Sequence, residues 1–195
     1  MQELARELFQ AGAVRFGDFQ LKDGRVSPFY LDLRLLVSYP DVLRRVGRML
    51  VEKSRGITFD RIAGIPYAGL PIAVAMALEG NLPAIYPRKE TKQYGAGRAV
   101  EGVHAPGERV LLVDDVLTTG GAKLEALAAL RSAELVVEDL LVVVDRSRDR
   151  GEALAREGIR VHRLFRVEEL LRGLRDEGLI GEGEHDRALS FVRAG

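Results

Sequence analysis

Short apolar runs alternate with helical patterns along most of the chain, and this alternation constrains the fold more than any other feature of the sequence. The clearest unit is an apolar strand at residues 109–114, a turn at 115–120 and a helix at 121–132. Other short apolar strands are predicted at residues 61–65, 83–87 and 135–145. Strands that alternate with helices are typical of a parallel sheet. The sequence therefore predicts an α/β fold with a central, mostly parallel sheet flanked by helices.

The remaining segments are predicted to form helices and weaker strands around this sheet. Amphipathic spacing or helix-forming composition predicts helices at residues 2–11, 40–53, 69–79, 166–177 and 184–193. Weaker strands are expected at residues 17–22, 29–34 and 159–164. Asp23 and Gly24 are turn-forming residues and separate the first two of these strands.

Composition limits the size of the fold and the classes of function. The chain has 195 residues, 47% of them hydrophobic, which fits a single domain spanning residues 1–195. It carries 29 basic and 29 acidic side chains, and this balance argues against a nucleic-acid partner. No basic start precedes an apolar run, and no apolar stretch approaches roughly 18 residues. We therefore expect a cytoplasmic protein without a membrane partner.

Cysteine and histidine usage argues against a protein-built metal centre. The chain has no cysteine, which excludes disulfides, thiolate metal ligands and a cysteine nucleophile. Its three histidines, His104, His162 and His185, are far apart and match no zinc spacing. No residue is assigned as a direct metal ligand.

The strongest chemical signal is the segment VLLVDDVLTTGGA at residues 110–122. Asp114 and Asp115 end an apolar strand, and a run of threonine and glycine then opens a helix. Open α/β sheets bind ligands at the carboxyl ends of their strands. Glycines let backbone N–H groups approach a phosphate, and a helix N-terminus favours an anion. Two interpretations remain open on these residues alone: a nucleotide-sugar site, or a structural turn with Asp and Thr as caps.

This segment resembles the motif with which type I phosphoribosyltransferases bind phosphoribosyl diphosphate (PRPP). In that family the paired acids hold the ribose hydroxyls, and the following loop cradles the 5′-phosphate. The resemblance implies that Asp114 and Asp115 act on the ribose in binding and catalysis. It implies a PRPP-binding loop made of Val116, Leu117, Thr118, Thr119, Gly120, Gly121 and Ala122.

Three further segments resemble the orotate phosphoribosyltransferases in particular. Residues 19–34 are similar to their N-terminal hood, residues 64–71 to their diphosphate-contacting loop, and residues 88–102 to their flexible catalytic loop. The resemblance covers nearly the whole chain. It implies a type I phosphoribosyltransferase fold with a small hood, formed by roughly residues 1–35 with a C-terminal contribution. It also implies a homodimer whose catalytic loop is shared between subunits.

Residues 88–104 lack an apolar period and carry several cations, so we interpret them as a long mobile loop. Arg88, Lys89 and Lys92 are closely spaced, and Arg98 follows. Such cations stabilise a departing diphosphate, and a closing loop excludes water. Without a family match, a basic cluster of this kind is usually a solvated surface loop. The family match favours PRPP binding by Arg88, Lys89, Lys92 and Tyr94, with Lys92 as a catalytic residue.

Arg146 follows the strand that ends at Asp145, beside the expected site. A guanidinium group binds a carboxylate in bidentate fashion, and orotate carries a carboxylate that uracil and the purines lack. The resemblance implies orotate binding by Arg146 and Thr118. On the residues alone, an ion pair with Asp149 or Glu152 explains Arg146 equally well.

The chain departs from the family pattern at two positions. Tyr94 stands where relatives often have histidine, so a general-acid role for this position is in doubt. Ala68 stands where some relatives have lysine, and it offers only backbone groups to the diphosphate. The nearby cations of residues 88–92 must then carry more of the charge.

The resemblance implies transfer of the phosphoribosyl group from PRPP to orotate, giving orotidine 5′-phosphate and diphosphate in pyrimidine biosynthesis. Mg²⁺ is the expected cofactor, bound mainly through the phosphates of PRPP. Two alternatives remain. One is a purine or uracil phosphoribosyltransferase, against which the hood and Arg146 argue. The other is a PRPP-sensing regulator that binds nucleic acid, against which the neutral charge argues.

Overall fold

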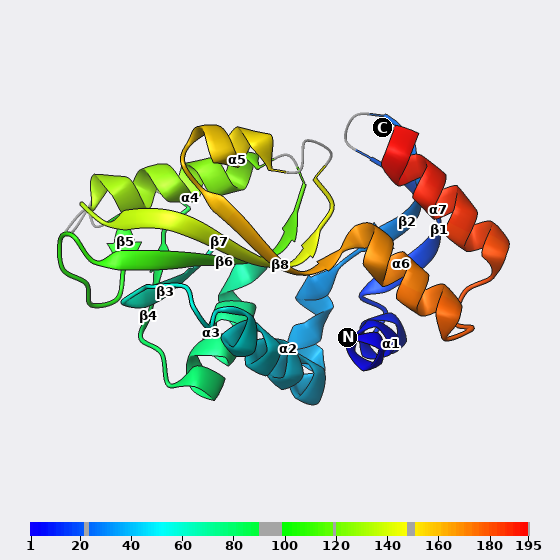
Figure 1. The fold of residues 1–195 in the computed structure, drawn as a ribbon, viewed down its shortest axis with the longest axis horizontal. Helices are drawn as coiled ribbons and strands as arrows, with labels where there is room; N and C mark the ends of the chain where they lie inside the picture. The colour runs from blue at the N-terminus through cyan, green and yellow to red at the C-terminus, as the bar shows by residue number, and fades with distance from the viewer. Residues whose placement is uncertain (22–23, 90–98, 119, 148–150, 195) are drawn as a thin grey trace.

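The computed structural model describes the chain except for residues 22–23, 90–98, 119, 148–150 and 195 (Figure 1). Within the described part, the strands form a six-stranded main sheet in the order β5-β4-β3-β6-β7-β8 and a separate β1-β2 pair. The main-sheet strands are β3 (Arg61–Gly64), β4 (Ala84–Pro87), β5 (Val100–Glu101), β6 (Arg109–Leu117), β7 (Val136–Asp145) and β8 (Arg160–Arg166). All neighbours in this sheet are parallel except β4 and β5. The predicted α/β architecture is confirmed.

Helices cover both faces of the main sheet (Figure 1). One face carries α2 (Pro40–Lys53) and α3 (Gly69–Gly80), and the other carries α4 (Gly121–Ser132) and α5 (Glu152–Arg156). Side chains of a strand point alternately to its two faces. Leu111 and Val113 therefore pack into the core on the α2 and α3 side, whereas Val110 and Leu112 pack into the core beneath α4. Burial on both faces explains why β6 is an almost continuous apolar run.

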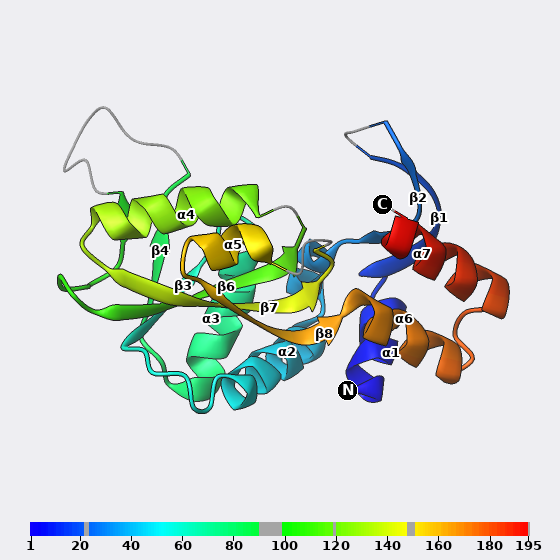
Figure 2. The ribbon, with the colours of Figure 1, turned by 45° about the horizontal axis from the view of Figure 1, so that its top comes forward.

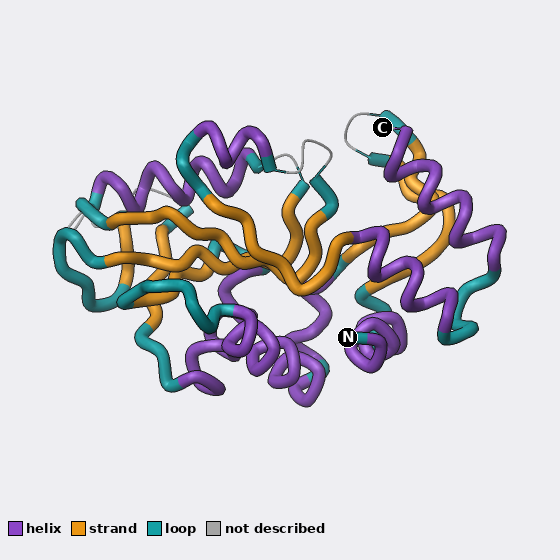
Figure 3. Tube along the Cα trace, in the orientation of Figure 1, coloured by secondary structure: helices purple, strands orange, loops and turns teal. Residues whose placement is uncertain are grey.

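The hood lies at one end of the main sheet and joins both ends of the chain (Figure 2). It consists of α1 (Gln2–Gln10), β1 (Val14–Gln20), β2 (Val26–Leu31), α6 (Val167–Asp176) and α7 (Glu182–Ala194). A ring contact fastens α7 to β2, because the Phe29 and Phe191 centroids lie 6.5 Å apart in an edge-to-face arrangement. The tube in Figure 3 shows α7 running alongside the β1-β2 pair. The C-terminal contribution to the hood is thus a direct packing contact.

Several predicted boundaries need correction. The turn expected at residues 115–120 begins later, because β6 continues to Leu117 and pairs with β7 as far as Asp145. The strands expected at 17–22 and 29–34 instead form β1 and β2, which each start three residues earlier. By contrast, the helix predicted at 40–53 is confirmed at both ends.

The segment 88–104, predicted to be a structureless loop, contains a short strand. Val100 and Glu101 form β5, which pairs antiparallel with Tyr86 and Pro87 of β4. Val100 is buried, so this end of the segment is anchored in the core. Residues 90–98 lie outside the described part of the chain.

Two short elements were not predicted. A 3-10 helix, η1 (Leu33–Ser38), links the hood to α2, and α5 spans only Glu152–Arg156. Both are too short to show a helical period in the sequence. No helix in the described residues has the length and apolarity needed to cross a bilayer.

Candidate active site

Three neighbouring parallel strands, β3, β6 and β7, end at the same edge of the main sheet (Figure 1). Most of the predicted site residues that the structure describes lie at the end of β6 or in the segments that follow these strands: residues 65–69 after β3, 118–122 after β6 and 146–147 after β7. The carboxyl edge of an open α/β sheet is where such folds bind ligands. The topology therefore brings together segments that are up to about eighty residues apart in the sequence.

Asp114 lies near the end of β6 and is almost fully buried, with an exposed fraction of 4%. Its Oδ2 atom lies 2.7 Å from the ammonium nitrogen of Lys123, and its Oδ1 atom accepts the N–H of Asp115 at 2.8 Å. Gly69, at the start of α3, packs against it so closely that a Cβ would lie 2.8 Å from Oδ1. Only a glycine fits this approach of α3 to β6.

Asp115 is less buried than its neighbour, and one of its carboxylate oxygens accepts the N–H of Val116 at 2.6 Å. Burial, and then the adjacent charge of Asp114, raise the pKa of Asp115 to about 7. Two carboxylates side by side disfavour double ionisation. A ligand that donates hydrogen bonds to Asp115 would favour its charged form.

The turn between β6 and α4 presents backbone groups rather than side-chain charges. Thr118 is exposed, and Gly120 has a φ of +85°, a left-handed conformation that favours glycine. No side chain caps α4, and Gly121 and Ala122 at its first turn are exposed. Free N–H groups at a helix start suit a phosphate. Thr119 lies outside the described residues.

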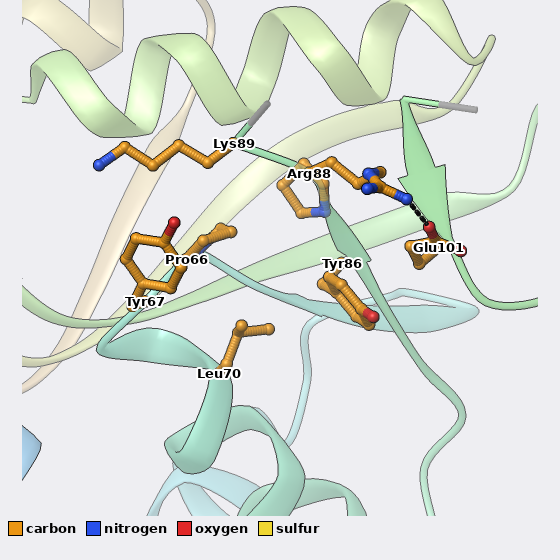
Figure 4. A pocket seen from close by; sticks show the side chains of 8 residues that line it. Pro66, Tyr67, Leu70, Tyr86, Arg88, Lys89 and Glu101 are labelled. Atoms are coloured by element: carbon orange, nitrogen blue, oxygen red, sulfur yellow. Dashed lines mark hydrogen bonds and ion pairs between the residues drawn. The ribbon is translucent and has the colours of Figure 1, made fainter. Parts of the chain in front are cut away.

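A pocket of about 250 Å³ opens beside the loop that follows β3 (Figure 4). Its lining joins that loop to the end of β4, and it comprises Pro66, Tyr67, Leu70, Tyr86, Pro87, Arg88, Lys89 and Glu101. The Lys89 ammonium nitrogen lies 5.1 Å from the centroid of the Tyr67 ring. Arg88 instead forms an ion pair with Glu101, with Nη1 and Oε1 2.6 Å apart. Of the two predicted cations described here, Arg88 therefore has an acidic partner on β5.

Arg146 leaves the end of β7 and reaches the hood. Its Cζ atom lies 4.8 Å from the Phe29 ring centroid and 5.8 Å from that of Phe191. Its Nη2 atom donates to the Ser27 hydroxyl at 3.5 Å, a long contact. Its backbone N–H donates to the carbonyl of Leu117 at 2.8 Å, which ties it to the turn after β6. Arg146 thus faces aromatic rings from both ends of the chain.

The backbone that carries Arg146 is fixed by Asp145, which is fully buried. One carboxylate oxygen of Asp145 accepts both the N–H of Ser147, at 2.9 Å, and its hydroxyl, at 2.6 Å. The other oxygen lies 3.3 Å from Arg163 and 3.4 Å from Arg166, both on β8. These bonds fix Asp145 and Ser147, the residues on either side of Arg146.

The predicted site residues divide into two sets. The first lies at or near the carboxyl edge of the sheet and comprises Arg88, Lys89, Asp114, Asp115, Val116, Leu117, Thr118, Gly120, Gly121, Ala122 and Arg146. Lys92, Tyr94 and Arg98 lie outside the described residues, as does Thr119. Nothing in the described structure tests their predicted roles.

Sequence reasoning missed several residues of this region. Ser27 and Phe29 lie within the segment 19–34, so its likeness to a hood could have drawn attention to them. Lys123 directly follows the Thr/Gly-rich motif, but nothing in the sequence marks it as buried. Phe191 gave no signal at all, because only the folding of α7 against β2 brings it to Arg146.

Comparison with known proteins places this geometry in a family. Residues 36–158 match the family model described as phosphoribosyl transferase domain. An orotate phosphoribosyltransferase from Pyrococcus furiosus is 40% identical over 171 residues, which are 87% of this chain and 94% of that protein. An orotate phosphoribosyltransferase structure from Aeropyrum pernix has a TM-score of 0.78 and 36% identity, covering 91% of this chain and 99% of that one. A UMP synthase structure from Leishmania donovani has a TM-score of 0.91 and 41% identity, covering 100% of this chain but 42% of that longer one.

Proposed function

Because the chain belongs to the orotate phosphoribosyltransferase family, we propose that it transfers the 5-phosphoribosyl group of PRPP to orotate. The products are orotidine 5′-phosphate and diphosphate, in pyrimidine biosynthesis. The observation that carries the proposal is the acid pair near the end of β6 with the glycine turn that follows it, joined through the Leu117 carbonyl to Arg146. This one edge of the sheet offers groups for a ribose, a phosphate and a carboxylate.

The donor half of the site would bind PRPP. We place the ribose hydroxyls at the Asp114–Asp115 pair, since carboxylates form strong hydrogen bonds to hydroxyl donors. The 5′-phosphate would lie at the start of α4, where backbone N–H groups lack a side-chain cap. This cradle comprises Val116, Leu117, Thr118, Thr119, Gly120, Gly121 and Ala122.

The acceptor half would bind orotate through Arg146, with Thr118 beside it. The guanidinium group matches the carboxylate of orotate in shape and charge. Phe29 and Phe191 flank Arg146, so the group is held by rings rather than swinging in solvent. An acceptor without a carboxylate would leave this cation unmatched, which favours orotate over uracil and the purines.

Catalysis would act on the charge that develops as the bond from C1 of the ribose to diphosphate breaks. Lys89 lies at the pocket after β4, and Lys92 and Tyr94 follow in the same segment. Cations placed near the leaving group stabilise the transition state more than the bound substrate. We assign this role chiefly to Lys92, and diphosphate binding to Arg88, Lys89 and Tyr94.

Mg²⁺ is the proposed cofactor. Among the described residues, the one group of three potential metal ligands is Glu182, His185 and Asp186 on α7, in the hood rather than at the carboxyl edge of the sheet. Asp115 keeps part of its surface exposed at that edge, which fits an ion held mainly by substrate phosphates and water. When bound, the ion would neutralise charge on the diphosphate.

We also propose a homodimer that shares the catalytic segment between subunits. Large apolar side chains are exposed near the pocket: Tyr67 at 64%, Val74 at 54% and Leu78 at 79%. Val74 and Leu78 are one helical turn apart on α3, so they form a stripe. A twofold contact through this surface, together with Tyr86 on β4, would bury the stripe and bring each segment 88–104 towards the other subunit.

A mixed-dimer experiment tests the shared site. Asp115→Asn chains and Lys92→Ala chains, each strongly impaired alone when PRPP is limiting, are mixed after mild unfolding and refolding. In a mixed dimer with shared sites, one site carries both defects and the other carries none, so about a quarter of the wild-type activity should return. If exchange of subunits is demonstrated and no activity returns, the segment 88–104 of each chain serves the active site of its own subunit.

The activity itself is tested by mixing the protein with PRPP and Mg²⁺ and following the absorbance of orotate. Parallel reactions contain adenine, hypoxanthine or uracil. Consumption of orotate alone supports the proposal, whereas consumption of a purine or of uracil would replace it with a different phosphoribosyltransferase. The expected cytoplasmic location and the expected lack of a nucleic-acid partner remain predictions.

A further inference from the structure

Lys123 is a buried lysine to which the proposed reaction assigns no role. It lies in the first turn of α4 with an exposed fraction of 6%. Its ammonium nitrogen lies 2.7 Å from Asp114 Oδ2 and donates to the Val116 carbonyl at 2.7 Å. A buried ammonium group is costly unless it is paired and hydrogen-bonded. Lys123 therefore belongs to a specific arrangement rather than to a solvated helix face.

This arrangement engages both carboxylate oxygens of Asp114. Oδ2 is paired with Lys123, and Oδ1 accepts the backbone N–H of Asp115. Gly69 covers the same Oδ1 atom, since a Cβ there would lie 2.8 Å away. A ribose hydroxyl could reach Asp114 only by displacing a buried ion pair or the start of α3.

Asp115 differs from Asp114 in both respects. Part of its surface is exposed, and its closest hydrogen bond comes from the N–H of the next residue along its own strand. Lys123 therefore gives different environments to two acids that look equivalent in the sequence. It also fixes the carbonyl of Val116, which lies near the end of β6, just before the turn that begins with the exposed Thr118.

From these contacts we infer that Lys123 is a positioning residue: it holds Asp114 inward and the Val116 carbonyl in place, and so leaves Asp115 as the acid that binds the ribose hydroxyls of PRPP. The inference rests on the proposed function, because it names the division of work within the PRPP site. It also gives Asp114 a different task from its neighbour. Asp114 anchors Lys123, and Lys123 anchors the cradle.

Three variants separate this role from simple stabilisation of the fold. Lys123→Met removes the ammonium group but keeps a side chain of similar length. Asp114→Asn combined with Lys123→Met removes both charges, so that no uncompensated charge stays buried. Asp115→Asn removes the proposed ribose ligand. Lys53→Met, at the exposed end of α2, is the matched control for the same chemical change.

Steady-state kinetics with PRPP, Mg²⁺ and orotate, together with thermal unfolding, are measured for each protein. Lys123→Met should raise the PRPP KM about tenfold or more, because an unpaired Asp114 charge disturbs Asp115 and the turn. The orotate KM should stay within about twofold, since Arg146 keeps its contacts. In the double variant, at least half of the increase in PRPP KM caused by Lys123→Met should be reversed on a logarithmic scale. Adding Lys123→Met or Asp114→Asn to Asp115→Asn should not lower the PRPP KM of that variant.

Two results would overturn the inference. One is a folded Lys123→Met protein with a lowered melting temperature but the wild-type PRPP KM, which would make the lysine purely structural. The other is a double variant whose PRPP KM rises as much as that of Asp115→Asn, which would make Asp114 a ribose ligand. If Lys123→Met does not fold, the double variant alone decides. A wild-type protein that does not consume orotate would contradict the proposed function instead, and calorimetric binding of PRPP to the same variants would still test Lys123.

Discussion

The two halves of the site are built by different means. The donor half comes from one continuous segment, β6 and the start of α4, in which backbone groups and a buried Asp114–Lys123 pair set the geometry. The acceptor half is assembled from three distant segments, because Arg146, directly after β7, meets Phe29 of β2 and Phe191 of α7. The donor half is thus local in sequence and rich in buried charge, whereas the acceptor half depends on how the hood docks.

Because the two halves are built from different segments, substitutions in them should affect the binding of different substrates. A substitution in the donor half should alter PRPP binding and its dependence on pH. A substitution in the acceptor half should alter orotate binding with little effect on PRPP. Sites that share no partners behave nearly additively. The backbone bond from Arg146 to the Leu117 carbonyl links the two halves and does not depend on the arginine side chain, and Thr118 is assigned to both halves.

Lys92→Ala should have the largest effect of these substitutions, and it should lower turnover rather than the binding of either substrate. We expect turnover to drop roughly a hundredfold, equivalent to about 3 kcal/mol, because the residue would act mainly on the departing diphosphate. The KM for orotate should change little. Steady-state kinetics at saturating PRPP checks this prediction, and an unchanged turnover number would remove Lys92 from the mechanism.

Arg146→Ala should raise the orotate KM roughly thirtyfold, because the carboxylate loses a charge-assisted partner in a partly desolvated site. The PRPP KM should stay within about twofold. Kinetics with each substrate varied in turn gives both values. A rise in the PRPP KM with normal orotate use would place Arg146 in the donor half.

The donor half should also show a pH-dependent stability that the acceptor half lacks. The pKa of Asp115 is raised to about 7, so the folded state favours its protonated form. The stability that it contributes is then full below pH 4 and lost as the pH rises through 7. Asp115→Asn, which stays neutral, should lose less stability than wild type over this interval.

Urea unfolding at several pH values between 4 and 8 measures this difference. Asp18→Asn, at an exposed position of β1, is the matched control and should follow the wild-type curve. Parallel curves for Asp115→Asn and wild type would mean that Asp115 ionises normally in the folded protein.

Phe191→Leu should have the smallest effect. The change removes a ring 5.8 Å from Arg146 while keeping an apolar side chain against the hood. A cation–π contact of this kind contributes about 0.5–1 kcal/mol, so the orotate KM should rise roughly threefold. Phe9→Leu, which disrupts a ring pair with Phe16 and not a contact with Arg146, is the control. An equal effect from both substitutions would indicate general loosening of the hood.

The same contrast explains what could be predicted from the sequence. The donor half was predictable because a strand, two acids and a glycine-rich turn follow one another within thirteen residues, 110–122. The length of β6 was not, because pairing with β7 extends it to Leu117. Strand β5 was missed because two residues carry no period, and only the edge of β4 defines it.

The acceptor half was predictable only in part. Arg146 could be found because it follows an apolar strand, but its partners could not, since Phe29 and Phe191 are 162 residues apart. The burial of Lys123 was also hidden, because a lysine near a helix start ordinarily lies in solvent. Its burial follows from the position of Asp114 opposite the first turn of α4.

Calorimetric titration of two variants with each substrate tests the division of the site most directly. PRPP with Mg²⁺, and separately orotate, are titrated into Asp115→Asn and into Arg146→Ala. We predict that Asp115→Asn loses about tenfold or more in PRPP affinity and keeps its orotate affinity, and that Arg146→Ala does the reverse. If each variant loses both ligands equally, or if the losses are exchanged, the two halves are not separate in the way that the structure indicates.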